Sequence, residues 1–163
     1  MNEIRITGES IQAGNDLSTE AMTMDVRDPG RKTLLLADDV DLFLQLQISY
    51  LGCRRFDIHT ARRGSEALET ARRIRPDLIL LDMFMPDMTG DEVCRILKED
   101  PGTNGIPVII VSSGTRTDSR KRCEAAGCDG LIHKPVRKDL LVSIVEKFLG
   151  IGLRHSPRVK IAL

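Results

Sequence analysis

The sequence predicts an α/β fold in which helices are wound on both faces of a five-stranded parallel sheet. Strand-like apolar runs alternate with helix-like segments from residue 32 to residue 149, and this alternation is typical of repeated β-α-β units with right-handed crossovers. One run, Leu78 to Leu81, places four apolar residues between Asp77 and Asp82, as expected for a central strand buried on both faces. We therefore expect a doubly wound, three-layer domain with five helices.

In the first half of this domain, turn signals separate the expected elements. The apolar run 33–37 predicts a strand, and 40–51 follows as a helix with apolar residues at helical spacing. These are Leu42, Phe43, Leu46 and Tyr50. Residues 56–60 predict a short second strand. A second helix opens at Gly64 and ends before Pro76, which cannot continue it. Its expected buried stripe is Ala67, Leu68, Ala71 and Ile74.

The second half repeats the pattern after the central strand. A helix at 90–99, with Val93, Ile96 and Leu97 inward, precedes the buried strand 108–111. The helix expected at 118–126 has little apolar surface, which predicts weak anchoring, and 130–133 is a short fifth strand. The closing helix, 137–149, has a strong apolar stripe. This stripe comprises Leu140, Leu141, Ile144, Val145 and Phe148.

Composition excludes several functional classes. Lys plus Arg equals Asp plus Glu at 24 each, so the net charge does not favour nucleic-acid or membrane-surface binding. No apolar run is long enough to span a bilayer, and the N-terminus lacks a secretory signal, so we expect a cytoplasmic protein. The cysteines form no CxxC pair and are expected to be reduced and mostly buried. They are Cys53, Cys94, Cys123 and Cys128.

Polar residues follow four of the expected strands. Asp38 and Asp39 end the first strand, Asp82 the third, Ser112 the fourth and Lys134 the fifth. Each alone has an ordinary explanation, such as a helix cap or a solvated charge, but parallel strands bring all five to one sheet edge. Clustered carboxylates need a cation, and all-oxygen ligands suit Mg²⁺. The set therefore predicts a carboxylate nucleophile, Asp82, that accepts a phosphoryl group beside a lysine and a hydroxyl.

These residues resemble the receiver domains of two-component response regulators over about residues 32–149. The resemblance implies a sheet order of 2-1-3-4-5, as in flavodoxin and chemotaxis-type receivers. Lys134-Pro135 resembles the family's cis-peptide turn. The matching stretches are Leu34-Leu35-Leu36-Ala37-Asp38-Asp39, Asp77-Leu78-Ile79-Leu80-Leu81-Asp82-Met83-Phe84-Met85-Pro86 with Gly90, Pro107-Val108-Ile109-Ile110-Val111-Ser112, and His133-Lys134-Pro135.

The resemblance also implies roles for individual residues. Asp82 would be phosphorylated by a histidine kinase or a phosphotransfer protein. Asp39, Asp82 and the backbone carbonyl of Phe84 would ligate Mg²⁺, and Asp38 would act mainly through water. The phosphoryl oxygens would be bound by Ser112 and Lys134.

Three positions depart from the usual receiver pattern. The aromatic residue expected three positions before the lysine is Leu131 here, so we expect Ser112 and the weakly anchored helix to carry more of the conformational response. Two further positions that influence hydrolysis in the family are Phe84 and Gly114. Neither side chain can hydrogen-bond a water molecule, which predicts a phosphoryl group that lasts for minutes or longer.

Outside the domain, residues 1–31 read as a flexible N-terminal extension and residues 150–163 as a basic tail. Arg154 and Arg158 resemble the opening RxxxR of PilZ-type cyclic-di-GMP-binding domains. A solvated basic tail and the start of such a downstream domain are both open interpretations. A partner motif of the form DxSxxG further along the reading frame would decide between them.

Three other functions compete with that of a signalling receiver that acts through protein contacts. Haloacid-dehalogenase-type phosphatases also use a strand-end aspartate, but they need a second acid at the position of Phe84. A nucleotide-binding domain is disfavoured because no G-x-G-x-x-G or Walker A loop follows a strand. A phosphorylation-independent scaffold would require an incomplete site.

Overall fold

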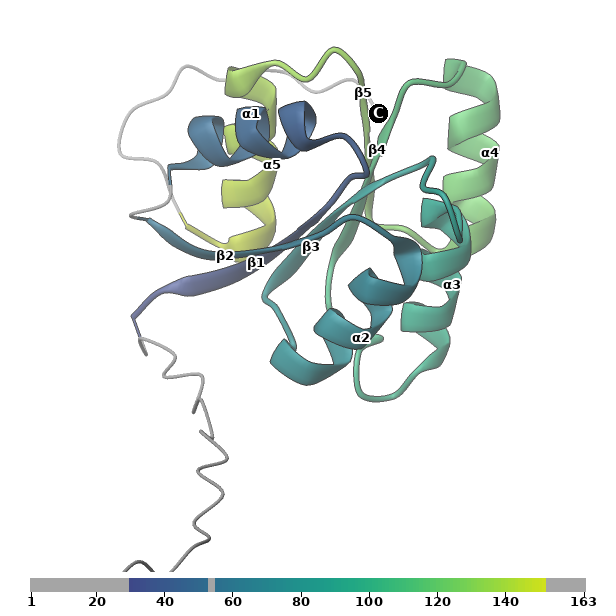
Figure 1. Ribbon diagram of the computed structural model, residues 1–163, viewed down its shortest axis with the longest axis horizontal. Helices are drawn as coiled ribbons and strands as arrows, with labels where there is room; N and C mark the ends of the chain where they lie inside the picture. Colours follow the sequence, from purple (N-terminus) through teal and green to yellow (C-terminus); the bar gives the residue numbers. More distant parts are fainter. Residues whose placement is uncertain (1–29, 53–54, 152–163) are drawn as a thin grey trace, which may run out of the picture.

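The computed structural model describes residues 30–52 and 55–151, which form a parallel sheet with helices on both faces (Figure 1). Most of the expected N-terminal extension and of the basic tail, including Arg154 and Arg158, lies outside the described residues. Within the described ranges, no helix has the length and apolar character needed to cross a membrane.

Strands and helices alternate strictly along the described chain. The strands are β1 (Lys32–Ala37), β2 (Phe56–Ala61), β3 (Leu78–Asp82), β4 (Val108–Ser112) and β5 (Gly130–His133). The helices are α1 (Asp41–Leu51), α2 (Gly64–Ile74), α3 (Gly90–Glu99), α4 (Arg116–Ala126) and α5 (Lys138–Leu149). The strand order is β2-β1-β3-β4-β5 and every neighbouring pair is parallel, which confirms the predicted fold.

The sheet separates two apolar cores because successive strand residues point to opposite faces. On β3, Ile79 and Leu81 face α2, α3 and α4, whereas Leu78 and Leu80 face α1 and α5. Figure 1 shows this division, with α1 and α5 together on one side of the sheet. The central strands are therefore buried on both faces, and their polar residues lie at the C-terminal edge of the sheet.

Helix α1 buries residues other than the apolar ones that stand at helical spacing in the sequence. Leu42 is 71% exposed, and the buried residues are Leu44, Gln47 and Leu51. The first turns of α1 carry apolar residues on several sides, so helical spacing alone does not select one face. Packing of α1 against α5 and the sheet makes that selection instead.

Candidate functional site

Residues from four strand ends meet at the C-terminal edge of the sheet. Asp38 follows β1, Asp82 and Ser112 are the last residues of β3 and β4, and Lys134 follows β5. Backbone hydrogen bonds extend the sheet past the strands, as where the Lys134 amide donates to the Ser112 carbonyl at 2.8 Å. The predicted residues are thus brought to one edge by strand register.

Lys134 bridges the two buried carboxylates. Its Nζ lies 2.7 Å from Oδ1 of Asp82 and 2.9 Å from Oδ2 of Asp38. Asp38 is fully buried and Asp82 is 4% exposed. The same ammonium lies 3.9 Å from the centroid of the Phe43 ring on α1, a cation–π contact that the sequence did not indicate. The Lys134–Pro135 peptide bond is cis, as expected.

The protonation of this group reflects its burial. Burial raises the pKa of Asp82 above its ordinary value of 3.8, and nearby Asp38 adds to this effect, although the hydrogen bond from Lys134 opposes it. Burial works against the charged form of Lys134, but its hydrogen bonds to Asp38 and Asp82 outweigh this and raise its pKa. Lys134 therefore stays positively charged at neutral pH, between two carboxylates that repel each other.

The loop from β3 to α3 fixes the orientation of Asp82. Oδ2 of Asp82 accepts a hydrogen bond from the Phe84 amide at 2.7 Å. The Gly90 amide donates to the Met83 carbonyl at 2.9 Å, and a Cβ at Gly90 would collide with the backbone carbonyl of Asp82. Only glycine therefore lets α3 begin so close to the end of β3.

The same loop is also attached to α2 through Asp87. Its carboxylate accepts hydrogen bonds from the Gly64 amide at 2.7 Å and the Ser65 amide at 3.0 Å. The hydrogen bonds from Ser65 hold the pKa of Asp87 well below its usual range. A carboxylate at the start of α2 is favoured by the unpaired amides there. No sequence pattern indicated this role, because residues 64 and 87 meet only through the fold.

On the other side of the site, Ser112 is connected to α4. Its hydroxyl accepts a hydrogen bond from the Gly114 amide at 3.0 Å and lies 2.7 Å from the hydroxyl of Ser119. Ser112 and Ser119 are both buried. Ser119 belongs to α4 and was not predicted, because a single serine in a polar helix carries no local signal.

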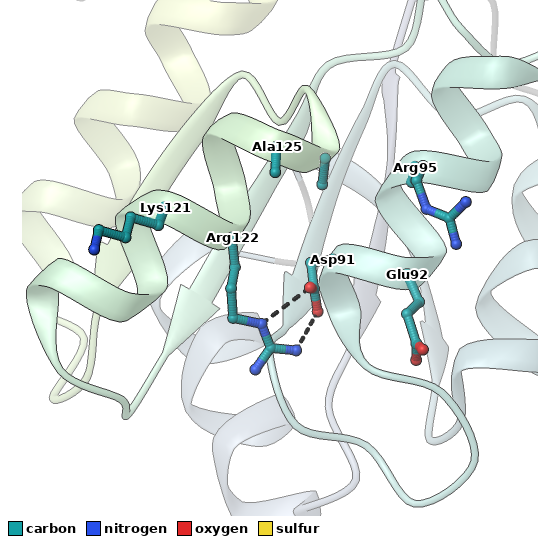
Figure 2. A pocket seen from close by; sticks show the side chains of 7 residues that line it. Asp91, Glu92, Arg95, Lys121, Arg122 and Ala125 are labelled. Atoms are coloured by element: carbon teal, nitrogen blue, oxygen red, sulfur yellow. Dashed lines mark hydrogen bonds and ion pairs between the residues drawn. The ribbon is translucent and has the colours of Figure 1, made fainter.

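Helix α4 is held to α3 by an ion pair. Arg122 places Nε 3.0 Å from Oδ2 of Asp91 and Nη2 2.5 Å from Oδ1, as Figure 2 shows. The guanidinium carbon also lies 5.6 Å from the centroid of the Phe84 ring, which is 45% exposed. A groove between α3 and α4 runs past this pair, with Lys121 and Arg95 on its two sides. The residue two positions after Asp82 therefore contacts α4.

Only some of the oxygen ligands expected for Mg²⁺ are gathered at the sheet edge. Asp38 and Asp82 supply buried carboxylate oxygens, but Asp39 is exposed. Among the described residues, no three His, Cys, Asp or Glu side chains gather closely enough to hold a metal by themselves. Mg²⁺ commonly uses one or two carboxylates and keeps several water ligands. Asp38 and Asp82 share the ammonium of Lys134, and the pKa of Asp82 is raised. Two neighbouring carboxylates of this kind are consistent with that coordination.

Known proteins resemble the chain in both sequence and structure. Residues 34–146 match the family model described as response regulator receiver domain. A polar-differentiation response regulator DivK from Brucella anthropi is 32% identical over 119 residues, covering 73% of this chain and 97% of the relative.

Solved structures of receiver proteins are also similar to this chain. The chemotaxis protein CheY4 of Vibrio cholerae has a TM-score of 0.68 at 26% identity, covering 73% of this chain and 99% of that one. The signal receiver domain of a histidine kinase from Syntrophus aciditrophicus has a TM-score of 0.69 at 29% identity, covering 81% and 99%. With its fold and most of its length matched in this way, the chain belongs to the response regulator receiver family.

Proposed function

We propose that this receiver domain is phosphorylated on the side chain of Asp82. The observation that carries the proposal is the setting of that carboxylate. It is almost fully buried at the end of β3, and its two oxygens are oriented separately by Lys134 and by the Phe84 amide. A carboxylate held in this way is ready to act as a nucleophile without prior rearrangement.

The phosphoryl donor would be a phosphorylated histidine, since receiver domains act with histidine kinases or phosphotransfer proteins. The Asp82 carboxylate attacks phosphorus, and the bond to the donor's imidazole nitrogen breaks. Lys134 and the Ser112 hydroxyl bind the phosphoryl oxygens as charge accumulates on them. Asp38, Asp39, Asp82 and the Phe84 carbonyl would hold Mg²⁺, directly or through water. The ion would offset the repulsion between carboxylates and phosphoryl group.

A direct test measures phosphorylation by intact mass after incubation with acetyl phosphate and Mg²⁺. The wild type should gain the mass of one phosphoryl group, and Asp82→Asn should gain none. Asp57→Asn is the matched control, because Asp57 is a half-exposed aspartate on β2 and should leave labelling unchanged. Chelating the metal should abolish labelling. A wild type that gains no mass, or an Asp82→Asn variant that still does, would refute the proposal.

We also propose that the phosphoryl group is long-lived once attached. Phe84 presents an apolar ring to the solvent beside Asp82, and Gly114 presents no side chain. Neither can orient a water for in-line attack. After removal of the donor, the labelled fraction should decay over minutes or longer, and Phe84→Asn should shorten this lifetime. Decay of the wild type within seconds would contradict the prediction.

A further inference from the structure

Three cysteines that the phosphorylation site does not use lie together behind α4. Cys94 of α3 and Cys123 of α4 belong to the same buried cluster, and Cys128, between α4 and β5, packs against it. The Cys94 thiol lies 3.6 Å from the Ala126 carbonyl at the last turn of α4. The thiols are therefore gathered at one end of the helix.

The backbone conformation at the C-terminal end of α4 brings two of these thiols together. Gly127 adopts a positive φ of 72°, its amide donates to the Glu124 carbonyl, and the Cys128 amide donates to the Cys123 carbonyl at 3.1 Å. These two bonds define a Schellman motif, in which the first and last residues bring their side chains into contact. Cys123 and Cys128 occupy those two positions, so the helix end brings their side chains together.

The three thiols differ in accessibility and in acidity. Cys94 and Cys123 are buried, whereas Cys128 is only half-buried and can be reached by a small reagent. The hydrogen bond from the Cys123 thiol lowers the pKa of Cys128, while burial raises the pKa of Cys94 to about 12. Since the thiolate is the reactive form, access and acidity both favour Cys128 over the other two thiols as the one that is oxidised first.

We propose that Cys128 and Cys123 form a peroxide-sensitive thiol pair at the C-terminal end of α4. The Cys128 thiolate attacks one oxygen of hydrogen peroxide, so that a sulfur–oxygen bond forms and hydroxide leaves. Cys123 then loses its proton, and its thiolate attacks the sulfur of this sulfenic acid. The sulfur–oxygen bond breaks, a disulfide forms, and the departing hydroxide takes up the proton to leave as water. A dithiol reductant restores both thiols by exchange.

The position of this pair connects it to the response of the domain. The buried side chains of α4 are Ser119, Cys123 and Ala126, and Ser119 lies one helical turn before Cys123. A disulfide would tie the last turn of α4 to the start of β5 and so restrict movement of the helix that contacts Ser112. The oxidation itself needs neither Asp82 nor a phosphoryl group.

The test uses the full chain in a Cys53→Ser background, treated with a small excess of hydrogen peroxide. Intact mass should fall by two hydrogens, and peptide mapping should join the Cys123 and Cys128 peptides until a dithiol is added. Cys123→Ser should instead give a dimedone adduct on Cys128. Cys94→Ser is the matched control and should still form the disulfide. Asp82→Asn should form it equally well, which separates this result from phosphorylation.

Peptide mapping of the unsubstituted chain gives the same information without any variant that could disturb folding. No Cys123–Cys128 disulfide under these conditions would overturn the proposal. Preferential oxidation of Cys94, or a disulfide that joins Cys128 to Cys94, would overturn it as well.

Discussion

The two sides of the site are built from different interactions. On one side, Asp38, Asp82 and Lys134 form a buried charged group with contacts of 2.7 and 2.9 Å. On the other side, Ser112 reaches α4 through a hydrogen bond between neutral hydroxyls. Helix α4 itself buries only small side chains, whereas α3 buries Val93 and Leu97 and has a capping box.

This difference suits the two sides to different tasks, because one holds the reacting carboxylate in place and the other is more weakly held. Buried charges are costly to leave unpaired, so the charged group has one strongly favoured arrangement. A neutral hydrogen bond contributes only about 1 kcal/mol net to stability. Because α4 buries little apolar surface, the hydrophobic effect adds little to the free energy that holds the helix in place. We therefore expect helix α4 to shift when Ser112 changes its hydrogen-bond partner, while the carboxylates stay in position.

The largest effect is expected on the charged side. Lys134→Met leaves two buried carboxylates without their cation, and breaking such a buried pair costs about 3–5 kcal/mol. The loss in unfolding free energy, measured by urea denaturation without metal at neutral pH, should shrink as the pH falls, because protonation removes the repulsion. Added Mg²⁺ should also reduce it. Lys138→Met, at the exposed start of α5, is the control; an equal loss there would contradict the assignment.

A steric change should come next. Gly90→Ala places a methyl group against the backbone carbonyl of Asp82, and overpacking of this kind costs about 1–3 kcal/mol. Because the collision falls on Asp82 itself, labelling by acetyl phosphate should also be lost. Gly105→Ala is the control, since a Cβ there meets nothing within 4 Å. Normal labelling of Gly90→Ala would show that the loop adjusts more freely than we infer.

Removing one charge should stabilise the protein. The folded-state pKa of Asp82 is raised, so the native state holds its proton at higher pH than the unfolded state, and stability falls as pH rises above 3.8. The Asp82→Asn side chain does not ionise, so the variant avoids this fall in stability. Lys134 still has Asp38 as a partner. We expect a gain of about 0.5–2 kcal/mol at neutral pH in metal-free buffer. The gain should disappear near pH 3.8; a gain independent of pH would argue against this cause.

The charged side could be predicted from sequence because its geometry follows from strand ends. Once β1, β3, β4 and β5 are recognised as parallel, Asp38, Asp82, Ser112 and Lys134 must meet at one edge. Helix α3 was predicted with its observed bounds, because Gly90 at its start and Pro101 after its end are local signals.

The α4 side could be predicted only in part. The low apolar content of the helix is visible in the sequence, but Ser119 and Arg122 acquire their partners through packing between separate elements. Asp39 shows the same limit on the charged side. The sequence groups it with Asp38, yet the structure buries one and exposes its neighbour. Contacts fixed by tertiary packing have no local pattern to reveal them.

The smallest effect on stability, and the sharpest test of the comparison, concerns Ser119. The Gly114 amide already donates to one lone pair of the Ser112 oxygen, and a Ser119 hydroxyl that donates to the other leaves the Ser112 proton free for a phosphoryl oxygen. Ser119→Ala removes this partner, so that the Ser112 hydroxyl is no longer held with its proton directed at a phosphoryl oxygen. It should cost about 1 kcal/mol in unfolding free energy and slow labelling by acetyl phosphate.

The same variant tests whether Ser119 connects the site to α4. In the wild type, beryllofluoride with Mg²⁺ should change the amide NMR shifts most strongly between Thr115 and Leu131. In Ser119→Ala these changes should shrink, while those around Asp82 persist, because the hydroxyl contact between strand and helix is gone. Ser49→Ala, on the exposed side of α1, should behave as the wild type. Undiminished changes along α4 in Ser119→Ala would mean that α4 responds through Arg122 and Phe84 instead, the other contacts that connect it to the site.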